Sequence, residues 1–276
     1  MPAVKRRLIV NADDFGASHS INQAVIEAHQ NGILTTASLM VNGDAAEEAV
    51  ALAKENPKLG VGLHLSLICG KSALSQKTIP NLVDEGRNFS NDPVKAGMRY
   101  FFGGVQTLTE LSAEISAQFE RFRKTGLNLD HVNGHLHFHM HPTVATVLFA
   151  NVANFGIRQM RLTRDPLLLN ARIGSGRWIY RLSHSLIFTL LAAKHRKEFR
   201  QRRIKATDRV FGLLQNALVD ESYVTKLLPR LPAGDSELYS HPSLDEFKNE
   251  FDALVSPRVR SLVEEEQIEL IRYADL

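Results

Sequence analysis

The sequence of 276 residues contains a single cysteine, Cys69, so no disulfide bond can form within the chain. No apolar run reaches the roughly 20 residues that a membrane-spanning helix needs. Near the N-terminus, the basic residues 5–7 lead directly into an apolar strand, without the apolar core of a secretion signal. We therefore expect a cytoplasmic protein that is either soluble or peripheral at the inner face of the membrane.

The chain also lacks a strong excess of charge and a glycine-rich phosphate-binding motif. Its formal net charge is +3, which is too small to indicate nucleic-acid binding by itself. No GxGxxG motif is present, so the sequence does not favour an open dinucleotide-binding sheet. Because 44% of the residues are hydrophobic, the chain can bury a large core, and we expect one domain over residues 1–276.

Strand-like and helix-like segments alternate along most of the chain. Such repeated units predict an α/β fold with a parallel sheet and outer helices, most simply a distorted (β/α) barrel; an open doubly wound sheet is the alternative. A helical insertion interrupts the alternation at about residues 167–207. The expected strands are 8–10, 35–41, 61–65, 159–162, 237–239 and 268–271, and the expected helices are 20–31, 45–55, 109–125, 142–155, 223–231 and 244–254.

Two adjacent carboxylates follow the first apolar strand. Asp13 and Asp14 stand directly after the apolar residues 8–10, and a glycine follows at position 16. A buried strand would deliver both acids to the mouth of the fold, where they could hold a cation or a proton. The alternative is that they cap the following helix.

Histidines are concentrated in one short segment. Five of them fall within residues 131–141, and alternation on a strand would direct His135, His137 and His139 to one face. His64 and His241 each lie at or near the end of a predicted strand. Strand ends of a barrel converge on one face, so these residues could meet.

One carboxylate and two imidazoles form a common site for a divalent metal ion, and the candidates here are Asp14, His64 and His135. Three simpler interpretations stay open. His64 could be a core histidine, His241 could pack at its strand end, and the cluster could be a structural zinc site.

Taken together, these motifs resemble the YdjC-like carbohydrate deacetylases, which include chitooligosaccharide deacetylase. The resemblance implies a polysaccharide-deacetylase-like barrel and metal-dependent hydrolysis of the N-acetyl group of an amino sugar, with one Mg or Zn ion. The motifs are Asn-Ala-Asp-Asp-Phe-Gly at 11–16, the segment 32–42, Gly-Leu-His-Leu at 62–65, the cluster at 135–142 and His-Pro at 241–242.

The resemblance also implies a role for each residue. Asp14, His64 and His135 become the metal ligands, Asp13 the catalytic carboxylate that takes a proton from water, and His241 the acid that gives one to the leaving amine. From the same motifs, the residues expected to contact substrate are Asn11, Phe15, Asn42, His137 and His139.

Two segments are similar to the hopanoid biosynthesis-associated branch of this family. They are Asp-His-Val-Asn-Gly-His at 130–135 and Asp-Arg-Val-Phe-Gly at 208–212. The similarity implies a lipid-linked substrate, an N-acetylglucosaminyl hopanoid. Soluble chitooligosaccharides are the alternative substrates. A metal-dependent phosphoesterase and a non-catalytic sugar-binding or lipid-binding protein are the alternative functions.

Residues 178–205 combine apolar and basic character. Apolar side chains between 179 and 191 mark one face of a helix, and seven Lys or Arg residues follow between 194 and 205. This pattern is typical of a helix on an anionic membrane surface. The alternative is a helix packed on the barrel with a solvated basic end. Nucleic-acid binding is a poorer interpretation because Phe199 is the only aromatic residue of the basic part. The sequence leaves the oligomeric state open, and a homodimer is compatible with it.

Overall fold

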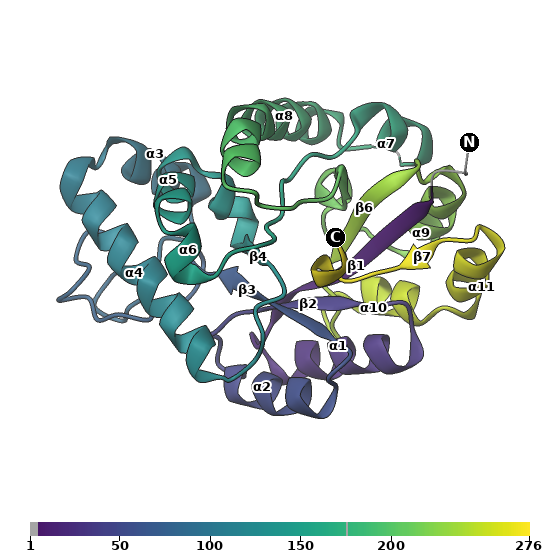
Figure 1. Cartoon of the computed structure of the whole chain (residues 1–276), viewed down its shortest axis with the longest axis horizontal. Coiled ribbons are helices and arrows are strands. Elements are labelled where there is room, and N and C mark those ends of the chain that lie inside the picture. Colours follow the sequence, from purple (N-terminus) through teal and green to yellow (C-terminus); the bar gives the residue numbers. More distant parts are fainter. Residues whose placement is uncertain (1–4, 175) are drawn as a thin grey trace.

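The computed structural model describes residues 5–174 and 176–276 and has an α/β fold around a curled parallel sheet (Figure 1). The strand order is β4-β3-β2-β1-β6-β5, and β7 pairs with the first residues of β1. The predicted fold class is confirmed in this form. The strands are β1 (Arg6–Phe15), β2 (Thr36–Leu39), β3 (Gly60–Leu65), β4 (Val132–Gly134), β5 (Arg209–Phe211), β6 (Gly234–Ser240) and β7 (Glu269–Leu270).

Helices surround this sheet. In Figure 1, α1, α2 and α10 lie along its lower side and α8 along its upper side. The helices are α1 (His19–Asn31), α2 (Ala46–Glu55), α3 (Pro93–Phe102), α4 (Gly104–Lys124), α5 (Pro142–Ala150), α6 (Val152–Phe155), α7 (Leu167–Ile173), α8 (Trp178–Gln201), α9 (Glu221–Leu227), α10 (Lys248–Val255) and α11 (Pro257–Glu265). None of the helices in the described ranges is long and apolar enough to cross a membrane.

An irregular segment lies between the two edge strands β4 and β5. The expected strand at 159–162 is reduced to isolated bridges, from Met160 to β4 and from Gln159 to Lys205. Further along, the backbone N–H of Val210 in β5 donates to the carbonyl of Arg164. This segment therefore spans the gap between the edge strands without forming a regular ladder, and it carries Arg161 into the interior, where the side chain is fully buried.

The segment between β5 and β4 also contains the predicted insertion. Residues 167–207 hold α7 and α8. The apolar residues that predicted a helix here end at 191, whereas α8 continues through the basic residues to Gln201. The sequence did not predict α3, which begins at Pro93 with Asp92 as its N-terminal cap. The division into one barrel domain with an insertion stays a prediction.

Candidate active site and metal centre

A local irregularity in β1 brings both aspartates into the same site. The pairing register of β1 with β2 shifts between Ala12 and Phe15, and Asp14 has a left-handed backbone with φ of 64°. Consecutive residues of a regular strand point to opposite faces, whereas a bulge re-aims one of them. The helix-cap alternative is wrong, because the N-cap of α1 is Ser18, whose side chain accepts from the N–H of Ile21.

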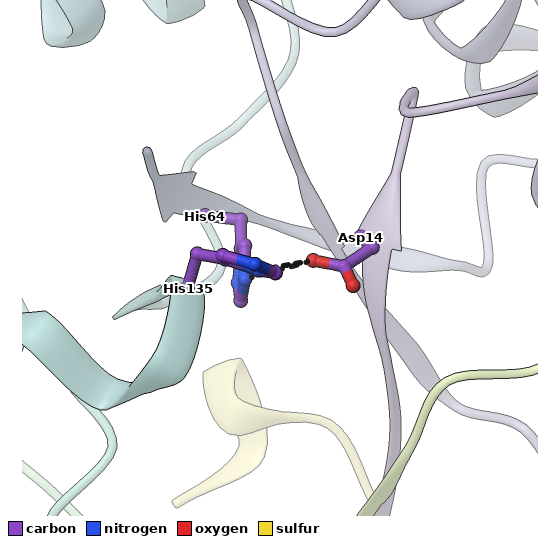
Figure 2. A group of neighbouring side chains, drawn as sticks. All are labelled: Asp14, His64 and His135. Carbon is purple, nitrogen blue, oxygen red and sulfur yellow. Dashed lines mark hydrogen bonds and ion pairs between the residues drawn. The ribbon is translucent and has the colours of Figure 1, made fainter. Parts of the chain in front are cut away.

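Asp14, His64 and His135 form a cluster with metal-ligand geometry (Figure 2). One ligand atom from each residue lies within 4.8 Å of the others. Oδ1 of Asp14 is 3.2 Å from Nε2 of His64 and 2.9 Å from Nδ1 of His135. His64 comes from β3 and His135 from the turn after β4, and β2 separates these strands from β1, which carries Asp14.

The donor set of this cluster fits a divalent cation. Nε2 of His64 is buried and makes no hydrogen bond within the described residues, although it faces the Asp14 carboxylate. Burial alone would lower the pKa of His135, but the Asp14 carboxylate raises it to about 10. The cluster therefore attracts positive charge, which a proton supplies at His135 and which a metal ion would supply to all three ligands.

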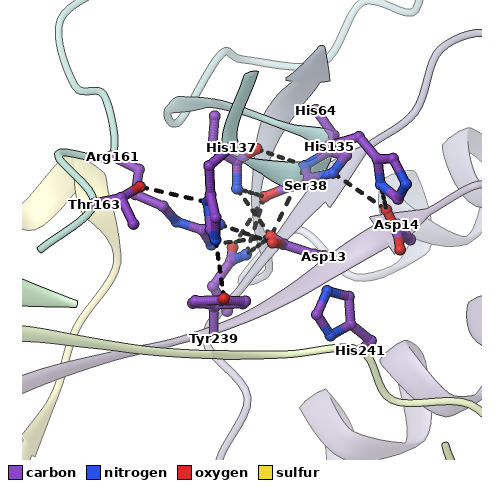
Figure 3. A network of polar contacts seen from close by, with 12 residues as sticks. Asp13, Asp14, Ser38, His64, His135, His137, Arg161, Thr163, Tyr239 and His241 are labelled. Carbon is purple, nitrogen blue, oxygen red and sulfur yellow. Dashed lines mark hydrogen bonds and ion pairs between the residues drawn. The ribbon is translucent and has the colours of Figure 1, made fainter. Parts of the chain in front are cut away.

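Asp13 lies beside this cluster and is held by several donors (Figure 3). Its carboxylate accepts from Nδ2 of Asn11 at 2.8 Å and from Nδ2 of Asn133 at 2.9 Å. Arg161 donates to both oxygens, at 2.7 and 2.9 Å. Burial alone would raise the pKa of Asp13, but Arg161 and His64 outweigh it and hold the pKa well below its usual range. The side chain is therefore a carboxylate at any physiological pH.

The Arg161 side chain is held in place by residues of β6. Its guanidinium also donates to Oε1 of Glu237 on β6 at 2.7 and 3.0 Å, and it lies 4.4 Å above the ring of Tyr239. Oε2 of Glu237 in turn accepts from the hydroxyl of Tyr273. Two carboxylates on one guanidinium form a paired and hydrogen-bonded charge cluster, which is the condition for keeping such groups in the interior.

His241 follows β6 and faces the same pocket (Figure 3). Its Nδ1 lies 3.7 Å from Oε2 of Glu250, which also accepts from the backbone N–H of His241 at 2.6 Å. Burial alone would lower the pKa of His241, but Glu250 and the aspartates at 13 and 14 raise it to about 9. At neutral pH this imidazole is therefore protonated and able to donate.

The expected alternation of histidines on one strand is wrong. β4 ends at Gly134, and a 3-10 turn from His135 to Met140 follows, in which Leu136 and His137 have left-handed backbone angles. The ring of His137 contacts the hydroxyl of Tyr239 at 2.9 Å, whereas His139 is fully buried with Nε2 at 3.1 Å from the carbonyl of Arg161. The histidines of this segment therefore have separate roles.

One cavity of about 540 Å³ connects these groups. Of the predicted site residues, Asp13, His64, His135, His137 and His241 line it, and Asp14 lies directly beside it. Most of the remaining lining is apolar or aromatic and comes from α3, α8 and the turn after β4. Its residues include Val94, Leu136, Tyr180, His184, Ile187 and Phe188.

Four of the expected substrate contacts are not among the residues that line this cavity. Phe15 is fully buried in the hydrophobic core, and Asn11 and His139 are fully buried in the polar network. Asn42 accepts from Arg121 through Oδ1. Of the five expected contacts, His137 lines the cavity. Substrate contact at the other four positions stays a prediction.

The sequence interpretation did not identify Arg161, Glu237, Asn133 or Glu250 as site residues. Glu237 stands in the mostly polar strand sequence Gly-Asp-Ser-Glu-Leu-Tyr-Ser of β6, so nothing in the sequence marks it as buried. Arg161 stands between Met160 and Leu162, and no motif connects either residue to Asp13 across the sheet.

The family model for YdjC-like protein matches residues 7–265. The chain belongs to this family. The YdjC-like chain is 45% identical over 143 residues to a carbohydrate deacetylase of Brevibacillus brevis, which covers 51% of this chain and 54% of the relative. It is 40% identical over 166 residues to a carbohydrate deacetylase of Geobacillus stearothermophilus, covering 59% and 63%. The match therefore spans between half and two thirds of each relative's length.

Two solved structures share the fold of this YdjC-like protein. A protein of Enterococcus faecalis V583 with the provisional name cellobiose-phosphate cleavage protein has a TM-score of 0.73 and 23% identity, and 98% of each chain is covered. An uncharacterized protein of Agrobacterium tumefaciens C58 has a TM-score of 0.53 and 12% identity, with 100% of this chain and 90% of that chain covered. At these identities the likeness concerns the fold alone.

Proposed function

We propose that this YdjC-like protein is a metal-dependent carbohydrate N-deacetylase, which hydrolyses the N-acetyl group of an amino sugar. The observation that carries the proposal is the combination in one cavity of a cation site, a carboxylate with a depressed pKa and an imidazole with a raised pKa. Amide hydrolysis needs one group that accepts a proton and another that supplies one. The relatives named carbohydrate deacetylases support the same reaction.

The residues divide the chemistry in the following way. Asp14, His64 and His135 would hold the divalent ion, Mg or Zn, which polarises an amide carbonyl and makes water more acidic. Asp13 accepts the proton of the attacking water. Arg161 and Asn133 keep its carboxylate oriented. Protonated His241 then donates to the nitrogen of the leaving amine.

For the substrate we propose an acetylated amino sugar attached to a lipid, an N-acetylglucosaminyl hopanoid. The polar residues of the cavity suit the sugar and its acetamido group. The rest of the lining offers instead the exposed side chains of Val94 on α3 and Ile187 on α8, together with Leu136 and the rings of Tyr180 and Phe188. A soluble oligosaccharide has no group that would gain from so much apolar surface, whereas a fused-ring lipid next to the sugar does.

The test is mass spectrometry after incubation of the metal-loaded protein with N-acetylglucosaminyl hopanoid and, separately, with diacetylchitobiose. We expect loss of one acetyl group and release of acetate, with a higher kcat/KM for the hopanoid. A higher kcat/KM for chitobiose would leave the deacetylase proposal intact and overturn the lipid-linked substrate. Loss of an acetyl group from neither compound would overturn both, and turnover of a phosphate ester instead would indicate a phosphoesterase.

A further inference from the structure

Most of the large apolar side chains that are exposed lie on two helical segments. The first is α3 with the start of α4. Its exposed residues are Val94, Met98, Phe101, Phe102 and Val105, and Val105 and Val94 are 81% and 73% exposed. Val94, Met98, Phe101 and Phe102 are spaced as on one face of α3, while Ala96 and Tyr100 are buried on the other side. Val105 follows in α4, beyond the helix break at Gly103.

The second segment is the N-terminal half of α8. Ile179, Leu182, Leu186, Ile187 and Leu190 are at least half exposed, and their spacing again describes one face of a helix. The alternative interpretation, in which this stripe packs on the barrel, is therefore wrong. Instead, the buried residues of α8 are mostly in its C-terminal half: Ala192, His195 and Phe199.

The apolar face of α3 and the apolar face of the N-terminal half of α8, called here the two stripes, border the same cavity. Val94 of α3 and Ile187 of α8 both belong to its lining, and Leu136, which is 46% exposed, lies in the lining as well. Each stripe continues from its lining residue along the outside of its helix. Exposed apolar surface of this kind, concentrated at the entrance of a binding site, is unusual for a surface in contact with water.

The charges around the stripes select one kind of occupant. α3 carries Lys95 and Arg99, both exposed, and has no acidic residue. α8 has Lys194, Arg196, Lys197 and Arg200 beyond its apolar half, and its one acidic residue, Glu198, pairs with Arg202. Apolar side chains beside Lys and Arg match the acyl region and the anionic headgroups of a phospholipid bilayer.

We propose that α3 and α8 together form a docking surface for an anionic membrane, with the active-site cavity opening between them toward the bilayer. The sequence had indicated only residues 178–205, and the structure adds α3 as a second arm. The proposal deepens the proposed function, because a lipid-linked sugar would enter the cavity from the membrane. Membrane docking can nevertheless be measured without any turnover.

The experiment is co-sedimentation of the full chain with vesicles of phosphatidylcholine containing phosphatidylglycerol, and with vesicles of phosphatidylcholine alone. We expect binding to the anionic vesicles that decreases with salt. Phe101→Ser with Phe102→Ser on α3, and Leu186→Ser with Leu190→Ser on α8, should each weaken this binding at least tenfold. All four side chains are exposed, so the thermal midpoint should stay unchanged.

A matched pair of charge variants tests whether vesicle binding depends on the lysines of this surface or on the positive charge of the whole protein. Lys194→Ser with Lys197→Ser should weaken binding and its salt dependence, whereas Lys54→Ser with Lys58→Ser, exposed lysines on and after α2, should not. Failure of the wild-type protein to bind the anionic vesicles would overturn the proposal, as would full binding by both apolar variants. If sedimentation velocity instead reveals a dimer that these apolar substitutions dissociate, the occupant is a second copy of the chain and the membrane proposal is wrong.

Discussion

Nδ1 of His64 lies 2.8 Å from Oδ1 of Asn133. The orientation of this amide follows from its other contact, because Asn133 reaches Asp13, a carboxylate that can only accept. The NH2 group must therefore face Asp13, and the carbonyl oxygen must face His64. An acceptor at Nδ1 requires a proton there, which leaves the lone pair of Nε2 free on the side of Asp14 and His135. The Asn133 side chain thus orients the Asp13 carboxylate, which is the proposed proton acceptor, and fixes the tautomer of His64 that can bind a metal ion.

We predict that Asn133→Ala weakens divalent-metal binding by roughly 10–100-fold, the usual cost of losing a partner behind a metal-bound histidine. Isothermal titration calorimetry with Zn²⁺ and Mg²⁺ would measure it. Asn170→Ala provides the control, since Asn170 is also a fully buried amide but contacts Asp165 instead of the cluster. Equal metal affinity in the wild-type protein and Asn133→Ala would mean that the amide does not set the tautomer.

The two neighbouring aspartates should respond differently to the same substitution. Asp14→Asn removes a ligand, so we predict loss of bound metal in elemental analysis together with loss of activity. Asp13→Asn should retain the metal, while kcat falls by roughly 10²–10⁴-fold because the proton acceptor is lost. Metal loss of the same size in both variants would contradict this division of roles.

Arg161 should be important for stability as well as for the site. Arg161→Met leaves the buried carboxylates of Asp13 and Glu237 without their partner, and breaking such a buried pair typically costs about 3–5 kcal/mol. Urea denaturation at neutral pH would measure the loss of unfolding free energy. The control is Arg202→Met, which breaks a partly exposed helical pair with Glu198 and should cost under about 1 kcal/mol.

The loss of unfolding free energy in Arg161→Met should depend on pH in one direction. The wild-type pKa of Asp13 is depressed, so its pairing stabilises the fold above the unfolded pKa of about 4 and is lost only as the pH falls through the lower folded value. Without Arg161, burial would raise that pKa. As the pH is lowered toward 5, the buried carboxylates of Arg161→Met should take up protons. The difference in unfolding free energy between this variant and the wild-type protein should therefore become smaller.

The sequence was sufficient for the site residues that stand at strand ends. Asp13 and Asp14 come after a short apolar run, His64 lies near the end of β3, and His241 follows β6; parallel strands bring such ends to one edge of a sheet. The periodicity rule failed after β4, because Leu136 and His137 adopt left-handed angles that no spacing of residues reveals.

Long-range partners were beyond the sequence for a different reason. Arg161 reaches Asp13 from 148 positions away, through a segment that forms only isolated bridges. Glu250 reaches His241 from α10. Each contact depends on how elements far apart in the sequence pack together. Neither Arg161 nor Glu250 stands in a local sequence pattern that would predict its partner. The exposed face of α3 was missed because its apolar spacing was not recognised as a helix between the flanking turn residues.

The pH dependence of activity provides the sharpest test of His241. Its pKa is raised to about 9, so it is protonated below that pH, and kcat/KM should fall as the pH rises through about 9 and the proton donor is lost. Glu250→Gln removes one carboxylate from beside the ring while keeping an oxygen that can accept from the backbone N–H of His241. The pKa of His241 should then fall, and the alkaline limb of the kcat/KM profile should move down by about one unit or more, since one unit corresponds to about 1.4 kcal/mol of lost charge interaction. Glu48→Gln, which removes a carboxylate beside the exposed His19, should leave the limb in place. An alkaline limb that does not move in Glu250→Gln would show that His241 is not the group that titrates there.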